Sequence, residues 1–365
     1  MSATASSVPA SVSPGTEPGY FETKFLRNTW YMAMWAAELR EGELVERTML
    51  GESIVFFRSA DGAISALTSR CPHRFAPLHL GTLLDGERIQ CPYHGLEFDG
   101  TGHCVRNPHG NGIIPNQMKV RSFTAIEKHT CIWVWMGDRS PDFSSVPDFS
   151  VIDDAAPGHV TKHDRIIVQA HYQLVADNLL DTSHGAYLHA GLLATVKNTN
   201  AEIAVESTDN SVTVKRLARS VPLVGLHLEY WPHSTFTVDQ YTAVRWSPPC
   251  YLLLTQGATL VGESSDTKVG YHGIHLLTPE TDRTTTYHFT AVRINVSTPA
   301  SRDAEINDKI EKARRFAFAE QDAPMIEAQQ KVIDAAGGRL QPTLVAVDAG
   351  PARCKRIIEK LLAAD

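Results

Sequence analysis

Two short segments of this chain each carry one cysteine and one histidine. Cys71 and His73 stand in the first segment and Cys91 and His94 in the second, with seventeen residues between His73 and Cys91. Two thiolates can hold one iron of a [2Fe–2S] cluster while two imidazoles hold the other, and the neutral imidazoles make the cluster easier to reduce. A Cys2His2 zinc site is the alternative, but it favours a pair of cysteines followed by a pair of histidines. The interleaved order therefore favours an iron–sulfur cluster that carries single electrons.

A second set of possible metal ligands lies near the middle of the chain. Asn178, Asp181 and His184 recur every three residues, so on a helix they share one face. His189 is five residues beyond His184, about 140° away on an ideal helix, so both imidazoles reach one metal only if the helix bulges or unwinds there. Gly185 weakens the helix at this point. Two imidazoles and one carboxylate would form the facial triad that holds Fe(II) with open positions.

The sequence leaves open which acid completes such a triad. Glu320, Asp322 and Glu327 are candidates on a late predicted helix. Taken alone, the two histidines are explained as well by core or surface positions as by a metal. The paired Cys–His segments favour the metal, because a cluster that carries electrons needs an acceptor.

The elements that must position these ligands fall into two regions. From about residue 24 to 138, short apolar runs alternate with Asp-Gly turns that begin at Asp61, Asp85 and Asp99. This pattern is typical of antiparallel strands joined by hairpins. Residues 131–135 are predicted to form a buried apolar strand. Both Cys–His segments are predicted to lie in loops between strands.

The second region predicts helix, antiparallel sheet, then helix. We expect helices at residues 173–192 and 301–335 and strands at 211–218, 226–231, 251–261, 271–277 and 284–294, the last two forming a hairpin. The whole chain is therefore predicted to be α+β. Residues 1–22 are expected to be a disordered leader, 23–145 an all-β iron–sulfur domain and 146–365 a catalytic domain.

Composition and charge exclude several classes of protein. A formal net charge of −7 gives no reason to expect nucleic-acid binding, and no apolar run approaches the roughly 18 residues that cross a bilayer. The first nineteen residues hold no Lys or Arg and no apolar core, unlike a secretory signal. Six cysteines are too few for a disulfide scaffold, so we expect a reducing cytoplasm. Four of them are read as buried thiols with no assigned role: Cys104, Cys131, Cys250 and Cys354.

The two groups of ligands together resemble the catalytic subunit of Rieske non-haem iron oxygenases. Residues 71–78 and 91–100 resemble the cluster-binding loops of that family, residues 178–189 its iron-binding helix, and residues 318–327 the region of its third iron ligand. The likeness extends from about residue 25 to residue 335. It implies a [2Fe–2S] cluster on the paired Cys–His segments and Fe(II) on His184, His189 and Asp322.

Within that family, residues 107–112 and 275–281 are most similar to the aromatic O-demethylase branch, which includes vanillate demethylase and dicamba monooxygenase. The resemblance implies a Rieske domain joined to a helix-grip catalytic domain, assembled as a homotrimer with the cluster of one subunit near the iron of the next. It implies that Asp181 bridges His184 and His94 across that interface. An acid that only favours the helix dipole is the alternative for Asp181.

These parts predict a terminal oxygenase that dealkylates a substituted aromatic. Electrons from NAD(P)H would come from a separate reductase, directly or through a ferredoxin, and O2 would react at Fe(II). Hydroxylation of an O- or N-linked methyl group would give a hemiacetal or hemiaminal that releases formaldehyde. Hydroxylation of a ring or side chain is one alternative, and a non-catalytic electron carrier is another, although the carrier would need only about 100 residues.

The residues expected to form the substrate pocket come mainly from the predicted strands. His275 is expected to contact the substrate, with a strand histidine bonded to a neighbouring backbone group as the alternative. Residues 251–256 contain no asparagine, and Ala313 stands near where the resemblance leads us to expect a tryptophan. Both departures favour a neutral aromatic ether, anilide or N-alkyl compound over an aromatic carboxylate.

Overall fold

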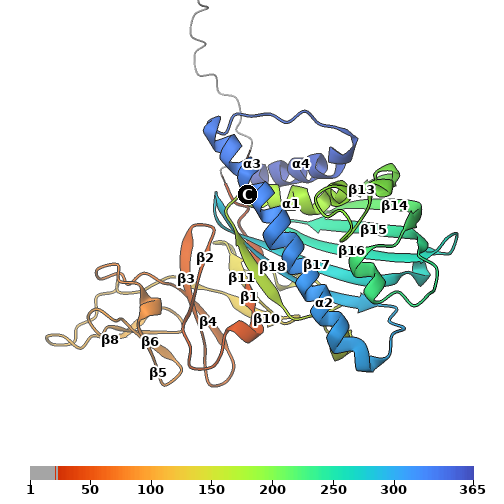
Figure 1. Cartoon of the computed structure of the whole chain (residues 1–365). Coiled ribbons are helices and arrows are strands. Elements are labelled where there is room, and N and C mark those ends of the chain that lie inside the picture. The colour runs from red at the N-terminus through yellow and green to blue at the C-terminus, as the bar shows by residue number, and fades with distance from the viewer. Residues whose placement is uncertain (1–20, 22–23) are drawn as a thin grey trace, which may run out of the picture.

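The computed structural model describes residue 21 and residues 24–365. The predicted leader therefore lies outside the described residues, apart from Phe21. Figure 1 shows a small β-rich region on one side and a large sheet flanked by helices on the other. In the described part of the chain, no helix is long and apolar enough to cross a membrane.

The N-terminal region consists of short antiparallel strands in three sheets, with orders β1-β11-β10, β2-β3-β4-β9 and β5-β6-β7-β8. Turns of the Asp-Gly type join several of these strands, as the sequence predicts. The strands are β1 (Thr29–Trp35), β2 (Val45–Met49), β3 (Glu52–Arg58), β4 (Ile64–Thr68), β5 (Thr82–Leu84), β6 (Arg88–Gln90), β7 (Glu97–Asp99), β8 (Cys104–Arg106), β9 (Ser122–Phe123), β10 (Ala125–Lys128) and β11 (Cys131–Met136).

The C-terminal region is built on one antiparallel sheet of order β12-β18-β17-β16-β15-β14-β13. Its central strands are buried almost throughout, and β17 pairs with β18 as the predicted hairpin. The strands are β12 (Asp164–Val168), β13 (Glu202–Ser207), β14 (Val212–Pro222), β15 (Thr237–Ser247), β16 (Tyr251–Leu260), β17 (Val269–Thr281) and β18 (Thr284–Ile294).

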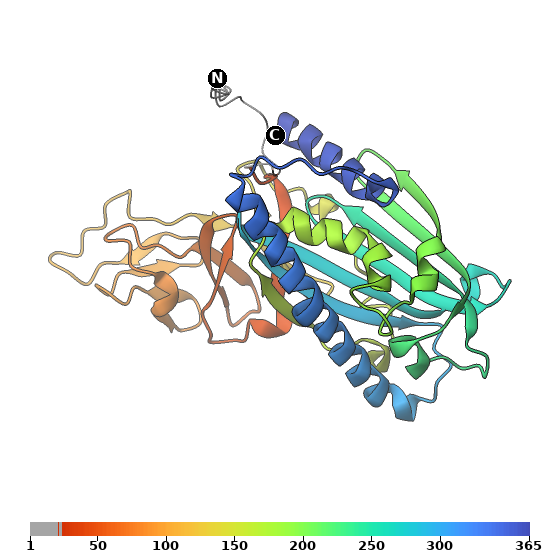
Figure 2. The same ribbon diagram turned by 45° about the horizontal axis from the view of Figure 1, so that its top comes forward.

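Four α-helices accompany this sheet: α1 (Tyr172–Leu180), α2 (Asp303–Arg315), α3 (Ala323–Ala335) and α4 (Ala349–Ala364). A π-helical segment, Phe316–Asp322, joins α2 to α3, so the three form one long rod across the sheet (Figures 1 and 2). Acids in the first turn of α2 and bases in its last turn complement the helix dipole. The α+β architecture predicted from the sequence is confirmed.

The two regions share apolar cores across their junction. Trp30 and Trp133 of the N-terminal strands pack in one cluster with Tyr251 and Ile274 of the large sheet. The hydroxyl of Tyr251 also donates a hydrogen bond to the carbonyl of Trp30. Burial of such large aromatic side chains holds the two regions together.

Two predicted elements are wrong. The strand expected at residues 226–231 is a short 3-10 helix, Gly225–Glu229. The helix expected over residues 173–192 ends as an α-helix at Leu180, because the Asp181 carboxylate accepts hydrogen bonds from the backbone and hydroxyl of Ser183 and starts a separate 3-10 turn. In the C-terminal region, four strands and helices were not predicted: β12, β13, β15 and α4.

Candidate active site

The two Cys–His segments form matching loops. Phe75 N donates to the carbonyl of Cys71 (2.9 Å), and Gly95 N donates to the carbonyl of Cys91 (3.0 Å). Each cysteine N–H in turn donates to a carbonyl five residues on, Ala76 O and Leu96 O. Each segment therefore makes the same tight turn, and the two turns present their side chains to one another.

The side chains of these loops meet at one place. The thiols of Cys71 and Cys91 lie within hydrogen-bonding contact, and the His73 and His94 ring centroids are 4.5 Å apart. Both cysteines are buried and free of disulfides. Burial raises the pKa of the Cys71 thiol, and the neighbouring Cys91 raises it further. Two thiolates and two imidazoles that converge in this way match the donor set of a Rieske cluster, whose irons would offset the thiolate charge.

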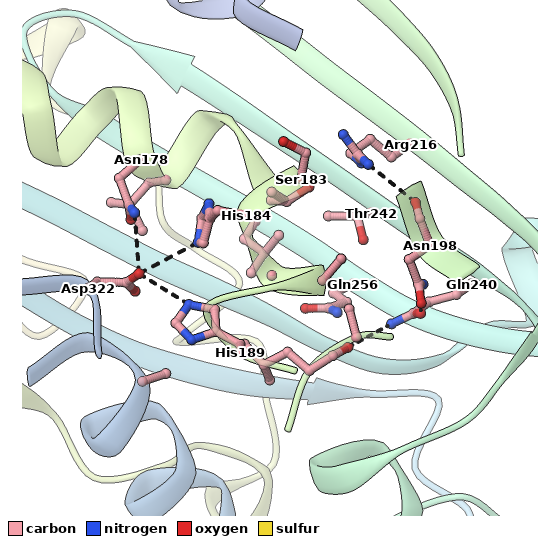
Figure 3. A pocket seen from close by; sticks show the side chains of 18 of the residues that line it. Asn178, Ser183, His184, His189, Asn198, Arg216, Gln240, Thr242, Gln256 and Asp322 are labelled. Atoms are coloured by element: carbon pink, nitrogen blue, oxygen red, sulfur yellow. Dashed lines mark hydrogen bonds and ion pairs between the residues drawn. The ribbon is translucent and has the colours of Figure 1, made fainter. Parts of the chain in front are cut away.

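Three further ligand side chains converge in the C-terminal region (Figure 3). The ligand atoms of His184, His189 and Asp322 all lie within 4.8 Å of one another. Asp322 Oδ1 is 3.1 Å from Nε2 of His189 and 3.6 Å from Nε2 of His184. Of the other two candidate acids, Glu320 is exposed, and Glu327 accepts a hydrogen bond from the backbone of Gln169.

Hydrogen bonds orient all three of these side chains. His184 donates from Nδ1 to the carbonyl of Asp181, and His189 donates from Nδ1 to the side-chain oxygen of Gln321 (2.8 Å). Asn178 Nδ2 donates to Asp322 Oδ1 at 3.2 Å. Both imidazoles therefore keep Nε2 free on the side that faces the carboxylate.

Two irregular segments bring these ligands together. The chain leaves the α-helical path at Leu180, so the angle between His184 and His189 is not that of one continuous helix. Asp322 closes the π-helical segment, and Pro324, which follows it, has no N–H to donate to the carbonyl of residue 320. The local unwinding expected near Gly185 is present, while the π segment occurs on the other helix.

The donor set fits a divalent iron. Two imidazoles and one carboxylate on one face leave other coordination positions open, as a facial triad requires. Burial lowers the pKa of His184, which keeps this ring neutral. For His189 burial lowers the pKa, but the hydrogen bond and charge of Asp322 outweigh it, so the net shift is upward. A bound cation would take the place of that proton beside Asp322.

The triad opens into a cavity of about 960 Å³, its mouth included. Figure 3 shows the triad on one side and amide and guanidinium side chains on the other. Asn198 Nδ2 donates to Gln240 Oε1 (2.6 Å), and Arg216 donates to the Asn198 carbonyl (3.4 Å). The size suits a ligand built on one aromatic ring.

His275, predicted to contact the substrate, lines this cavity and is buried. Its Nδ1 lies 2.6 Å from the hydroxyl of Tyr287, a side-chain partner and not the backbone partner of the alternative reading. Burial lowers its pKa well below the usual value, and Arg314 lowers it further, so the ring is neutral. A role in substrate binding stays a prediction.

Asp181 has a local structural role in the single chain. Its carboxylate caps the 3-10 turn through Ser183, with both contacts at 2.8 Å. This is close to the alternative reading of Asp181 as a helix-start acid. Its bridge between His184 and His94 of another subunit stays a prediction.

Several residues of the site were not singled out from the sequence. Gln321 was overlooked because its partner, His189, is far away in the chain. Arg314 had a detectable signal: it follows Ile306 and Ile310 at spacings of four, on the buried stripe of α2. The other overlooked polar residues of the cavity are Asn198, Arg216, Gln240, Thr242 and Gln256.

Comparison with known proteins gives two family matches. Residues 29–124 match the Rieske [2Fe-2S] domain, and residues 168–364 match the vanillate O-demethylase oxygenase C-terminal domain. Both ranges fall within the predicted domains 23–145 and 146–365, whose boundaries stay a prediction.

Individual relatives match over nearly the whole chain. The oxygenase component of dicamba O-demethylase from Stenotrophomonas maltophilia is 34% identical, covering 92% of this chain and 98% of that protein. The oxygenase component of chloroacetanilide N-alkylformylase from Rhizorhabdus wittichii is 33% identical, covering 93% and 97%. A crystal structure of dicamba monooxygenase bound to 3,6-dichlorosalicylic acid superposes with a TM-score of 0.86 at 33% identity, covering 93% of this chain and 99% of that one.

Proposed function

Because this chain belongs to the Rieske non-haem iron oxygenases of the aromatic O-demethylase branch, we propose that it is the terminal oxygenase that dealkylates a substituted aromatic compound. One observation carries the proposal. A single chain holds a pair of Cys–His loops and a separate group of two histidines and one aspartate, and that group opens into a cavity of ligand size.

The proposed roles of the residues follow from their contacts. Cys71, His73, Cys91 and His94 would hold the [2Fe–2S] cluster. His184, His189 and Asp322 would hold Fe(II). When bound, these groups supply one-electron transfer and O2 activation for hydroxylation of a C–H bond.

The protein's own part is to position the ligands and the substrate. Asn178 fixes the carboxylate of Asp322, and Gln321 fixes the ring of His189. The walls of the cavity decide which C–H bond lies next to the triad. Where that bond belongs to a methyl on oxygen or nitrogen, the hydroxylated product is a hemiacetal or hemiaminal, which breaks down to formaldehyde and a phenol or amine.

The proposal includes partners and assembly. Relatives named as oxygenase components work with separate electron donors, so we expect a reductase that uses NAD(P)H, alone or with a ferredoxin. We also propose a homotrimer in which Asp181 links His184 to His94 of a neighbouring subunit. The free thiols of all six cysteines support a reducing, cytoplasmic compartment.

A formaldehyde-release screen tests the reaction. The holoenzyme, a surrogate reductase and NADH are incubated with methoxy- and N-alkyl aromatics, and formaldehyde is measured against NADH consumed. The proposal predicts formaldehyde in step with the dealkylated product for at least one compound. Hydroxylated products without formaldehyde across the whole panel would instead establish ring or side-chain hydroxylation.

A further inference from the structure

Arg314 is a buried cation in the wall of the cavity. The residue is only 4% exposed, and its Nη1 donates to the carbonyl of Thr290 at 2.6 Å. Nη2 is buried and has no hydrogen-bond partner within the described residues. A charged N–H group that is removed from water without an acceptor is strongly unfavourable.

The surroundings of Arg314 offset only part of the free-energy cost of burying its charge. Its guanidinium carbon lies 5.8, 5.7 and 5.5 Å from the ring centroids of Tyr271, Phe289 and Phe318. Cation–π contacts of this kind stabilise a charge. They leave the N–H of Nη2 without an oxygen acceptor.

Two other arginines in this part of the fold each have a carboxylate partner. Arg293 on β18 is also 4% exposed, and its Nη1 forms an ion pair with Asp303 at 2.8 Å. Arg315, next to Arg314, forms an ion pair with Asp164 at 2.7 Å. Among the described residues, Arg314 alone of these three has no ion pair with a carboxylate. Of these three arginines, the one without a carboxylate partner is the one that lines the cavity.

The charges around the cavity also favour an anionic ligand. Asp322 is the one acid among the described residues that line it, and Arg216 and Arg314 are both cationic. The carboxylate of Asp322 faces the two histidines and is assigned to the metal. A divalent ion there would make the lining more positive still. Such a cavity attracts an anion.

We propose that Arg314 binds an anionic group, a carboxylate or sulfonate, on the aromatic ring of the substrate. The inference rests on the proposed dealkylase function and names its substrate class. Arg314 and Asp322 are eight residues apart on one helical rod, Arg314 in the last turn of α2 and Asp322 at the end of the π-helical segment. Their side chains reach toward the same cavity, so one substituted ring can place its anion at Arg314 and its alkyl group at the triad.

Binding requires a small adjustment of the side chain. Nη2 is shielded from water in the ligand-free chain, so the guanidinium must turn toward the cavity when the anion enters. The anion then supplies the acceptor that Nη2 lacks, in a charge-assisted hydrogen bond. This assignment reverses the preference for a neutral substrate that Ala313 and the absence of asparagine in residues 251–256 suggested.

Equilibrium binding without turnover tests the role of Arg314. Holoenzyme without reductase is titrated calorimetrically with the three methoxybenzoates, a methoxybenzenesulfonate and the matching neutral carboxamides. The wild type should bind at least one acid about tenfold or more tightly than its neutral partner, since hydrogen bonds to charged groups are worth that much. The Arg314→Gln variant should lose about 10- to 100-fold in acid affinity, with carboxamide binding unchanged.

Two further variants control this experiment. Arg314→Lys keeps the charge and should retain part of the preference for the acid, whereas Arg315→Gln should behave as wild type. If Arg314→Gln fails to fold, two measurements still test the proposal. They are the ratio of acid to carboxamide affinity in the wild type and the same ratio in Arg314→Lys. Absence of acid binding, equal affinity for acid and carboxamide, or an equal loss of both in Arg314→Gln would overturn the proposal.

The experiment separates this inference from the proposed function. Binding of acids that depends on Arg314, together with no formaldehyde from any bound methoxy acid, would support the anion site and contradict dealkylation. Formaldehyde from neutral substrates, with no effect of Arg314→Gln on binding, would support dealkylation and contradict the anion site.

Discussion

At the scale of single residues, the proposed iron site depends on which nitrogen of each histidine is free. His184 and His189 each donate from Nδ1, to a backbone carbonyl and to the Gln321 amide. These bonds fix the tautomer and leave Nε2 as the basic nitrogen that can bind a metal. Gln321 also donates from Nε2 to the carbonyl of Leu188 (2.8 Å), so it holds the loop that carries His189.

Replacement of Gln321 by leucine should therefore weaken the iron site without unfolding the protein. We expect the Gln321→Leu variant to lose about 10- to 100-fold in Fe(II) affinity, as is usual when a partner of a metal ligand is removed. Competition with a chromogenic chelator measures this. Glu320→Gln, at the exposed neighbouring position, is the matched control, and equal affinities in both variants would contradict the role of Gln321.

The sequence located the ligand candidates but not the residues that orient them. Cys71, His73, Cys91 and His94 could be recognised because their types and local spacing are characteristic. Gln321 could not be assigned in this way, because its partner His189 comes from a distant segment that only the fold brings near. The spacing of Arg314 indicates burial on α2 but not the cavity that it lines. Spacing alone also could not choose among Glu320, Asp322 and Glu327.

At the scale of elements, the irregular segments are what place the ligands. The end of α1 at Leu180 and the π-helical segment before α3 each change the direction in which a ligand points. The sequence predicted a long helix at both places because the apolar period continues across them. The Asp181 side chain instead ends α1 by bonding to Ser183, and the missing N–H of Pro324 removes an α-helical hydrogen bond at the π-helical segment.

Gly185, which lines the cavity, and Gly273, which lies beside His275, should respond differently to alanine. A Cβ at position 273 would lie 2.8 Å from Nε2 of His275 and 3.3 Å from the Leu254 side chain. At position 185 the nearest atom is the Ala194 Cβ, at 3.9 Å. We expect Gly273→Ala to displace His275 and lower kcat/KM about tenfold, and Gly185→Ala to keep near wild-type turnover.

The measurement for this pair is kcat/KM on one substrate, with iron content as the control. Both variants should keep the iron of the wild type. A large loss in Gly185→Ala alone would mean that glycine is needed for the unwound turn, as the sequence suggested, and would contradict the explanation based on Asp181.

At the scale of the whole molecule, the buried histidines outside the metal sites make the fold sensitive to acid. Burial lowers the pKa of His171 to about 3, of His227 to about 4 and of His288 to about 3. Neighbouring arginines lower the pKa of His171 and His288 further. Both ring nitrogens of His288 lack a hydrogen-bond partner among the described residues, so this ring is buried neutral between the two regions of the chain.

Stability should therefore fall as the pH decreases below about 6.5. The unfolded chain binds protons at these histidines near pH 6.5, whereas the folded chain does not, so the folded state is favoured above this pH and loses stability below it. Each such histidine contributes a loss of about 2 kcal/mol between neutral pH and pH 5. Urea unfolding at several pH values measures this, and His288→Leu should flatten the profile. A free energy of unfolding that stays constant in the wild type from pH 7 to pH 5 would contradict this role of the buried histidines.

The two-region architecture was predictable at this scale, since strand-rich and helix-containing parts differ in pattern along the chain. The joint core was not, because Trp30 and Tyr251 come from opposite regions and neither pattern indicates its partner. The elements β12, β13, β15 and α4 were missed, although α4 carries a helical signal, since Cys354, Ile357 and Ile358 recur at spacings of three to four and are buried.

The central claim is that one chain carries two independent iron sites, and the His184→Ala variant tests it most directly. Iron content, the visible spectrum and formaldehyde release are measured on the same wild-type and variant preparations. The wild type should hold about three iron atoms per chain, two in the cluster and one at the mononuclear site. The variant should hold about two, keep the cluster spectrum unchanged and release no formaldehyde. A variant that loses the cluster spectrum, or that keeps three irons and full turnover, would contradict the account.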